Sequence, residues 1–215
     1  MKKITLLFTL SAILLLAVTV VAQDEDEEEG KWRNFEVNIH GGFTVPGSYL
    51  SDWQDSLGAK LGFNTSLSGG YYFTSALCGG MYFNYSQMSI DGDWDRKFRM
   101  YDFGGYAKYA FEGESNFEPY GKVTFGVMIP KYPTWVPPDA RNHLREQSYD
   151  PGFATAIYAG VLYYTSYSGG VFAEVGFHND FVKGVRADYA DVALDKNVNY
   201  FEIRLGISVF YGVED

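Results

Sequence analysis

The residues of this sequence best placed to do chemistry are eight charged side chains at even-numbered positions, in segments whose odd-numbered positions are apolar. Charges that share one face of a strand and are removed from water must be paired, because an isolated buried charge costs several kcal/mol. We therefore expect ion pairs that join acids such as Glu202 or Glu174 to bases such as Lys122 or Lys108. The expected network has four acids and four bases: Glu36, Asp102, Glu174, Glu202, Lys60, Lys108, Lys122 and Arg204.

Two roles are open to such a network. It can cross-link strands and fill an enclosed space with side chains, which is a structural role. It can also act as a gate, in which the pairs exchange partners and admit water or small ions. The parity of the residues does not decide between the two.

A second acidic group resembles the start of a calcium-binding loop. Residues 91–95 read Asp-Gly-Asp-Trp-Asp, and Asp102 falls at the twelfth position of such a loop. The sixth position is Arg96, where the loop needs glycine, and Asp-Gly is a common hairpin turn. We interpret the segment as a turn and predict no metal site.

Neither the histidines nor the cysteine suggest catalysis. His40, His143 and His178 are too scattered for a metal set, and we expect hydrogen-bonded or solvent-exposed roles for them. Cys78 is the only cysteine, so no internal disulfide can form and thiol or zinc chemistry is unsupported. No nucleophile with a base and an orienting acid can be assembled from any local motif. We predict no catalytic residues, no cofactor and no enzyme activity.

The elements that must position these residues are strands, because polarity alternates residue by residue. Between Tyr200 and Tyr211 the odd positions are apolar and the even positions include Glu202, Arg204 and Ser208, a pattern that a helix would scramble. The same parity recurs in six further segments, and Gly152–Tyr164 is a strand whose orientation stays open because both its faces are apolar. The eight predicted strands span residues 34–45, 59–73, 77–85, 101–111, 121–129, 152–164, 171–177 and 200–211.

Composition decides which face of these strands points outward. A soluble lipocalin-like barrel would turn the apolar face inward and the polar face to water. Here the polar face is rich in glycine and serine and its charges balance, which suits the narrow interior of an eight-stranded barrel. Aromatic residues of the apolar face gather near strand ends, as expected at the two lipid headgroup levels. We predict an all-β fold, an eight-stranded antiparallel up-and-down transmembrane β-barrel in which the first strand pairs with the last.

The two ends of the chain predict further segments outside the barrel, and the net charge limits the possible partners. Residues 1–22 have the layout of a secretory signal peptide, with a retained transmembrane helix as the alternative. We expect an acidic disordered leader at 23–33, the barrel at 34–211 and a short tail at 212–215. Removing Lys2 and Lys3 changes the net charge from 17 − 27 = −10 to 15 − 27 = −12, which argues against a nucleic-acid partner.

Connections between the predicted strands alternate in length. Residues 74–76, 112–118 and 165–168 are short, whereas 46–56, 89–97, 131–151 and 179–199 are longer, as in barrels with tight periplasmic turns and long outer loops. The loop 131–151 is rich in aromatic residues, arginine and proline, so it is either a binding surface for a ligand or a rigid exposed loop.

Three local sequences resemble one known family. They are Glu-Pro-Tyr-Gly at 118–121, Gly-Val-Phe-Ala-Glu-Val-Gly-Phe at 170–177, and the strand that ends at Tyr211. They are similar to the small outer-membrane β-barrel family of OmpA, OmpX and OmpW type, often labelled porin family. The family usually ends on an aromatic residue that the insertion machinery recognises, whereas here residues 212–215 follow Tyr211.

The resemblance implies a monomer in the bacterial outer membrane, in contact with its lipid and lipopolysaccharide and inserted by the barrel-assembly machinery. It implies a structural or surface-contact role with a largely filled lumen. A narrow porin-like channel for water, ions or very small solutes is the alternative, and a lipid-modifying enzyme is a third. One such enzyme type uses a histidine with a serine two positions on, but His178 is followed by Asn179 and Asp180.

Overall fold

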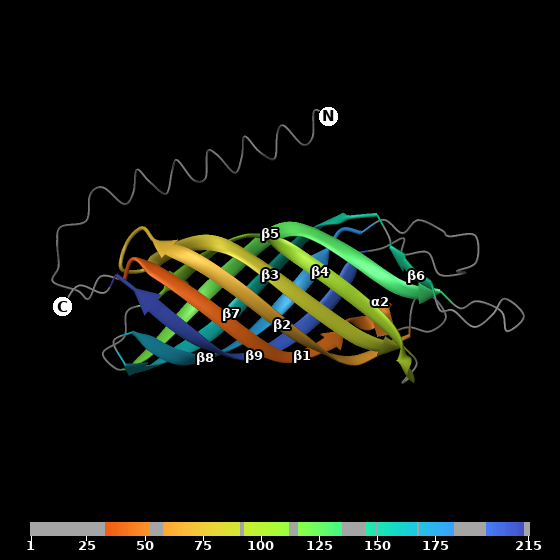
Figure 1. The fold of residues 1–215 in the computed structure, drawn as a ribbon, viewed down its shortest axis with the longest axis horizontal. Helices are drawn as coiled ribbons and strands as arrows, with labels where there is room; N and C mark the ends of the chain where they lie inside the picture. Colours follow the sequence, from red (N-terminus) through yellow and green to blue (C-terminus); the bar gives the residue numbers. More distant parts are fainter. Residues whose placement is uncertain are drawn as a thin grey trace, which may run out of the picture.

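Alternating polarity gives each long strand two different faces, and the computed structural model shows that the chain closes these strands into a barrel (Figure 1). The structure describes residues 33–51, 58–90, 93–111, 116–134, 145–148, 150–166, 168–182 and 197–212. The eight barrel strands are β1 (Phe35–Pro46), β2 (Ala59–Tyr72), β3 (Leu77–Ile90), β4 (Asp93–Ala110), β5 (Phe117–Thr134), β7 (Gly152–Ser166), β8 (Gly169–Asp180) and β9 (Val198–Tyr211). Two short elements, α2 (Ser48–Ser51) and β6 (Arg145–Ser148), accompany them.

Every barrel strand pairs antiparallel with its neighbours in the chain, and β1 pairs with β9 to close the ring. The closing register places Phe35 opposite Tyr211 and Pro46 opposite Tyr200. In Figure 1 these two strands, at opposite ends of the colour scale, lie side by side. The predicted eight-stranded up-and-down barrel, closed between its first and last strands, is confirmed. The short strand β6 was not predicted and extends the sheet beside the end of β5.

One predicted connection is wrong. Residues 89–97 were expected to form a longer loop, but β3 continues to Ile90 and β4 begins at Asp93, with Ile90 paired to Asp93. Only residues 91–92 separate the two strands. Residues 93–95 of the acidic group belong to β4, whereas residues 91–92 lie outside the described residues, so the turn interpretation stays a prediction.

Along the middle of each strand, the odd-numbered side chains point outward and form an apolar surface. Ile39, Leu205 and Ile207 are 62%, 68% and 59% exposed, although a soluble protein would bury such residues. Their even-numbered neighbours His40, Arg204 and Ser208 are buried inside the barrel. β7 follows the same parity as the other strands, so the orientation left open by its sequence is now assigned.

Outward-facing aromatic rings gather in two belts near the ends of the strands. One belt includes the contacting pairs Phe35–Tyr71 and Phe117–Tyr163, and the other includes Phe63–Tyr85 and Phe177–Phe201. Within the described strands, no outward-facing residue between the belts is charged. The belts lie about eight residues apart along a strand, which at ~3.3 Å per residue and a ~40° tilt corresponds to roughly 20 Å, near the height of a lipid-facing apolar band.

The predicted signal peptide at 1–22 and all but one residue each of the predicted leader and tail lie outside the described residues. In the part of the chain that the structure describes, no helix is long and apolar enough to cross a membrane.

Glycine at position 42 is required by the close approach of β1 and β9. A β-carbon there would lie 1.8 Å from the backbone oxygen of Ile203, whereas a β-carbon at Gly121 would meet nothing within 4 Å. We expect Gly42→Ala to lower the free energy of unfolding by about 3 kcal/mol, since a strand must move to relieve the overlap. Urea unfolding in detergent measures this effect. Gly121→Ala is the matched control, and an equal loss in both variants would contradict the explanation.

Candidate functional site

Seven of the eight charged residues predicted from the sequence lie in the lumen, whose two ends differ. At the turn end, residues 73–76, 111–116 and 167–168 connect the strands, and β1 begins and β9 ends there. At the loop end lie α2, β6 and the connections 47–58, 91–92, 135–151 and 181–197. The side chains between the two ends form three layers: two clusters of ion pairs and an apolar cluster.

The turn-end cluster is centred on Glu36. One of its oxygens, Oε2, accepts hydrogen bonds from Lys108 Nζ and from Tyr72 Oη, the latter at 2.9 Å. The other oxygen accepts from Tyr106 Oη at 2.9 Å, and Cys78 Sγ lies 3.5 Å from it. All five side chains are buried. We call Glu36, Lys108, Tyr72, Tyr106 and Cys78 the turn-end cluster.

The central cluster contains two carboxylates bridged by one guanidinium. Lys122 Nζ donates to both oxygens of Glu174, at 2.9 and 2.7 Å. Arg204 donates from Nη1 to Glu174 at 3.0 Å and from Nη2 to Glu202. The ring of Tyr158 lies against both cations, 4.6 Å from Lys122 Nζ and 4.4 Å from Arg204 Cζ. We call Glu174, Lys122, Arg204, Glu202 and His178 the central cluster.

Glu202 is the most heavily hydrogen-bonded carboxylate of the central cluster. Its Oε1 accepts from Ser86 Oγ at 2.7 Å and from Asn84 Nδ2 at 3.3 Å. In addition to the Arg204 contact, its Oε2 lies 2.8 Å from His178 Nε2 and 3.1 Å from Tyr158 Oη. Glu202, Ser86 and His178 are fully buried. The Ser86 hydroxyl is bonded to the carboxylate and not to the imidazole, so the three groups do not form a nucleophile with its base.

A separate ion pair lies at the mouth of the turn end. Arg33 Nη2 and Glu118 Oε2 are 2.7 Å apart, and Tyr164 Oη donates to the same carboxylate oxygen at 2.5 Å. The Arg33 guanidinium also lies over the rings of Tyr164 and Phe210, at 4.4 and 4.8 Å from their centres. This pair covers the lumen where β1 begins.

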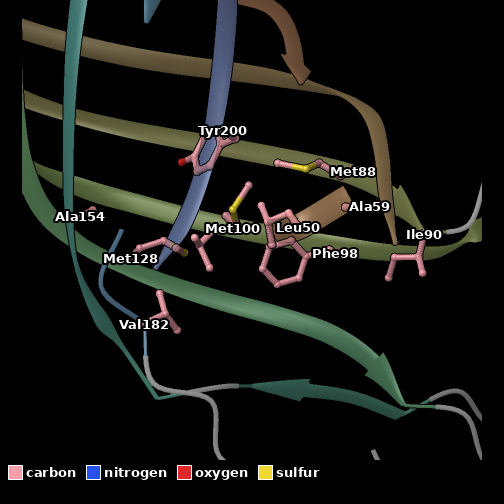
Figure 2. Close-up of a cluster of buried hydrophobic side chains, with 11 residues drawn as sticks. Leu50, Ala59, Met88, Ile90, Phe98, Met100, Met128, Ala154, Val182 and Tyr200 are labelled. Carbon is pink, nitrogen blue, oxygen red and sulfur yellow. The ribbon is translucent and has the colours of Figure 1, made fainter. Parts of the chain in front are cut away.

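An apolar cluster fills the lumen at the loop end (Figure 2). Leu50 reaches it from α2, and Tyr200 reaches it from β9, where its ring stacks on His178 at 4.2 Å. Except for Val182, which is 3% exposed, its members are fully buried. The apolar cluster consists of Leu50, Ala59, Met88, Ile90, Phe98, Met100, Met128, Ala154, Val182, Val198 and Tyr200.

Seven of the eight predicted charges lie inside the barrel, and Lys60 does not. Ala59 pairs with Ile90 but Gly62 pairs with Met88, so a β-bulge interrupts the register and the Lys60 side chain is exposed. Asp102 is buried, and its described partner is a neutral donor, Tyr82 Oη at 2.8 Å, in place of the base that was expected.

The sequence interpretation missed several lumen residues near strand ends. Arg33, Glu118 and Asp180 were assigned to the leader or to connections, although Glu118 and Asp180 have the even parity of the lumen face. The even-numbered tyrosines 72, 106, 120 and 158 are the principal neutral donors to the carboxylates. Their parity was visible in the sequence, but alternation alone gave them no role.

The described residues contain no group of three or more His, Cys, Asp or Glu side chains that could hold a metal ion. The described side chains of the lumen contact one another through ion pairs and hydrogen bonds.

Comparison with solved structures places the fold. Neisserial surface protein A has 18% identity and a TM-score of 0.60, with 82% of this chain and 97% of that protein covered. The chain has the fold of a bacterial outer-membrane β-barrel. The outer-membrane barrels Ail of Yersinia pestis and OprG of Pseudomonas aeruginosa each match at 13% identity with a TM-score of 0.48, covering 84% and 87% of this chain and all of theirs.

No family model matches the sequence, and no curated protein matches it significantly.

Proposed function

We propose that this chain is an integral protein of the bacterial outer membrane, whose closed lumen serves stability and whose role is structural or in surface contact. The exterior supports the membrane location, because an uncharged apolar band between two aromatic belts matches a lipid layer and would aggregate in water. Outer-membrane lipid and lipopolysaccharide would surround this band. We further propose that the barrel-assembly machinery inserts the protein and that it acts as a monomer.

The proposed orientation follows from the connections. The turn end, with its short connections, faces the periplasm and the loop end faces outward, as is usual for such barrels. The loop 131–151 then lies at the cell surface, where a ligand would bind it. Most of that loop is outside the described residues, so its surface role is a proposal from composition alone.

The observation that supports a closed lumen is the apolar cluster. Eleven buried apolar residues from the barrel wall and α2 cross the outward mouth, and a narrow apolar section excludes water and ions. Below it, the charges of the two ion-pair clusters are held by several hydrogen bonds each. An ion would have to displace both layers to pass.

Single-channel conductance of the refolded protein in a planar bilayer tests this proposal. We expect no reproducible conductance steps from protein whose folding is verified by its heat-dependent shift in gel mobility. Reproducible steps from the unmodified protein would overturn the closed lumen and establish a transport role.

A second candidate function is a gated pore, which the position of Leu50 favours. This residue belongs to α2, a single helical turn between β1 and β2 that is held to β9 by the Gly47 N to Asn199 O hydrogen bond at 2.8 Å. Movement of α2 would withdraw one side chain from the apolar cluster. A gated pore predicts conductance from Leu50→Ser, whereas Ser51→Ala in the same turn is the matched control and should stay silent.

A further inference from the structure

A small cavity lies in the middle of the lumen, where the two ion-pair clusters meet. Its volume is about 10 Å³. Tyr106 of the turn-end cluster lines one part of it, and Lys122 and Arg204 of the central cluster line another. His40 from β1 and Thr124 from β5 also line it, and Ser66, Ser68 and Tyr82 complete the wall.

Four polar atoms of this wall have no partner in hydrogen-bond geometry among the described residues. They are Thr124 Oγ1, which faces the Tyr82 hydroxyl outside that geometry, Arg204 Nε and both ring nitrogens of His40. The three side chains are buried, with 6%, 3% and 4% exposure respectively. A buried polar group that has lost water without gaining a partner is strongly unfavourable, and such groups in folded proteins are usually satisfied by ordered water.

The chemistry of the wall defines what can satisfy these atoms. Arg204 Nε only donates, Thr124 Oγ1 both donates and accepts, and a neutral imidazole offers one donor and one acceptor. The occupant must therefore accept from the guanidinium, and it donates to or accepts from the one ring nitrogen of His40 that faces it, according to the tautomer. A metal cation does not fit, because Arg204 and Lys122 line the cavity. A volume near 10 Å³ is close to the smallest that holds one water molecule, and it leaves no room for a polyatomic anion.

We propose that this cavity is a binding site for a single ordered water molecule held by His40, Thr124 and Arg204. The water ties β1, β5 and β9 together across the lumen. It also adjoins Tyr106 on one side and Lys122 on the other, so it connects the turn-end and central clusters into one hydrogen-bonded column. This inference concerns the interior of the barrel and does not depend on what the surface loops bind.

Replacing the Thr124 hydroxyl by a methyl group distinguishes a hydrated site from a dry one by the sign of the effect. If a water is bound, Thr124→Val removes one of its partners, and the urea midpoint in detergent should fall by about 0.5 M. If the site is dry, the hydroxyl is an unsatisfied buried group, and its removal should raise the midpoint. Thr65→Val is the matched control. The Thr65 hydroxyl lies on the outer face and already donates to the His40 carbonyl oxygen at 3.1 Å.

A direct measurement on the unmodified protein keeps the proposal testable if Thr124→Val fails to fold. A crystal structure at better than about 2 Å should show one water within hydrogen-bond distance of Thr124, Arg204 and His40. Density for that water together with a lowered midpoint supports the site. A cavity without water density, or a raised midpoint, overturns it.

Discussion

Glu202→Gln is expected to destabilise the barrel by ~3–5 kcal/mol, because the change leaves the buried guanidinium of Arg204 with half of its compensating charge. The carboxylate also accepts hydrogen bonds from Ser86 and Asn84 through one oxygen. A neutral amide of the same size has one acceptor oxygen in place of two, and its NH₂ group would face donors. Urea unfolding of the detergent-refolded protein, followed by tryptophan fluorescence, measures the loss.

Glu118→Gln provides the matched control for this prediction. Glu118 also pairs with an arginine, but its side chain is 13% exposed at the mouth and Arg33 is 15% exposed. Both side chains are partly exposed, whereas Glu202 is fully buried, so we expect a smaller loss of about 1–2 kcal/mol. A similar loss from the two substitutions would show that burial does not set the cost, and would contradict the account of the central cluster.

Lys108→Met is expected to cost ~3–5 kcal/mol, and a second substitution, Glu36→Gln, should recover much of that loss. The single change leaves the Glu36 carboxylate charged and buried with only neutral donors, namely Tyr72, Tyr106 and Cys78. The double variant has neither charge, so its neutral amide remains among phenols that can still bond to it. A double-mutant cycle by urea unfolding should give a coupling of about 2–3 kcal/mol.

Additive losses in that cycle would mean that the two charges do not compensate each other. The hydroxyls of Tyr72 and Tyr106 permit a further control. Tyr72→Phe and Tyr106→Phe each remove a single neutral hydrogen bond to the Glu36 carboxylate. Each should cost about 1–2 kcal/mol, well below the Lys108 substitution.

The alternation of polarity was sufficient to predict the strands, their closure and most of the lumen face. It failed where the polarity of the two faces reverses. At the loop end of β3, Met88 and Ile90 face inward and are fully buried, while Gln87 and Ser89 occupy the opposite face. Side chains still alternate between the two faces there, but the inner face becomes apolar. The sequence analysis therefore ended this strand at residue 85, before the structure does.

The same reversal explains why the apolar cluster was not predicted. Met128 occupies an even position of a predicted strand, which was assigned to a polar lumen, and Met100 lies just before the predicted start of its strand at residue 101. An apolar residue at even parity near a strand end was the available signal. No such signal existed for the bulge at Lys60, because one extra residue in a strand depends on the register with its neighbour and not on local composition.

The pairing of β1 with β9 also bears on the order in which the molecule can be made. β1 is synthesised first, yet one of its edges receives its hydrogen bonds only from the last strand of the barrel. Throughout export, that edge and the apolar outer faces have no partner within the chain, which is the condition that favours aggregation. We therefore expect the exported chain to depend on a chaperone until β9 has reached β1 and the barrel can close in the membrane.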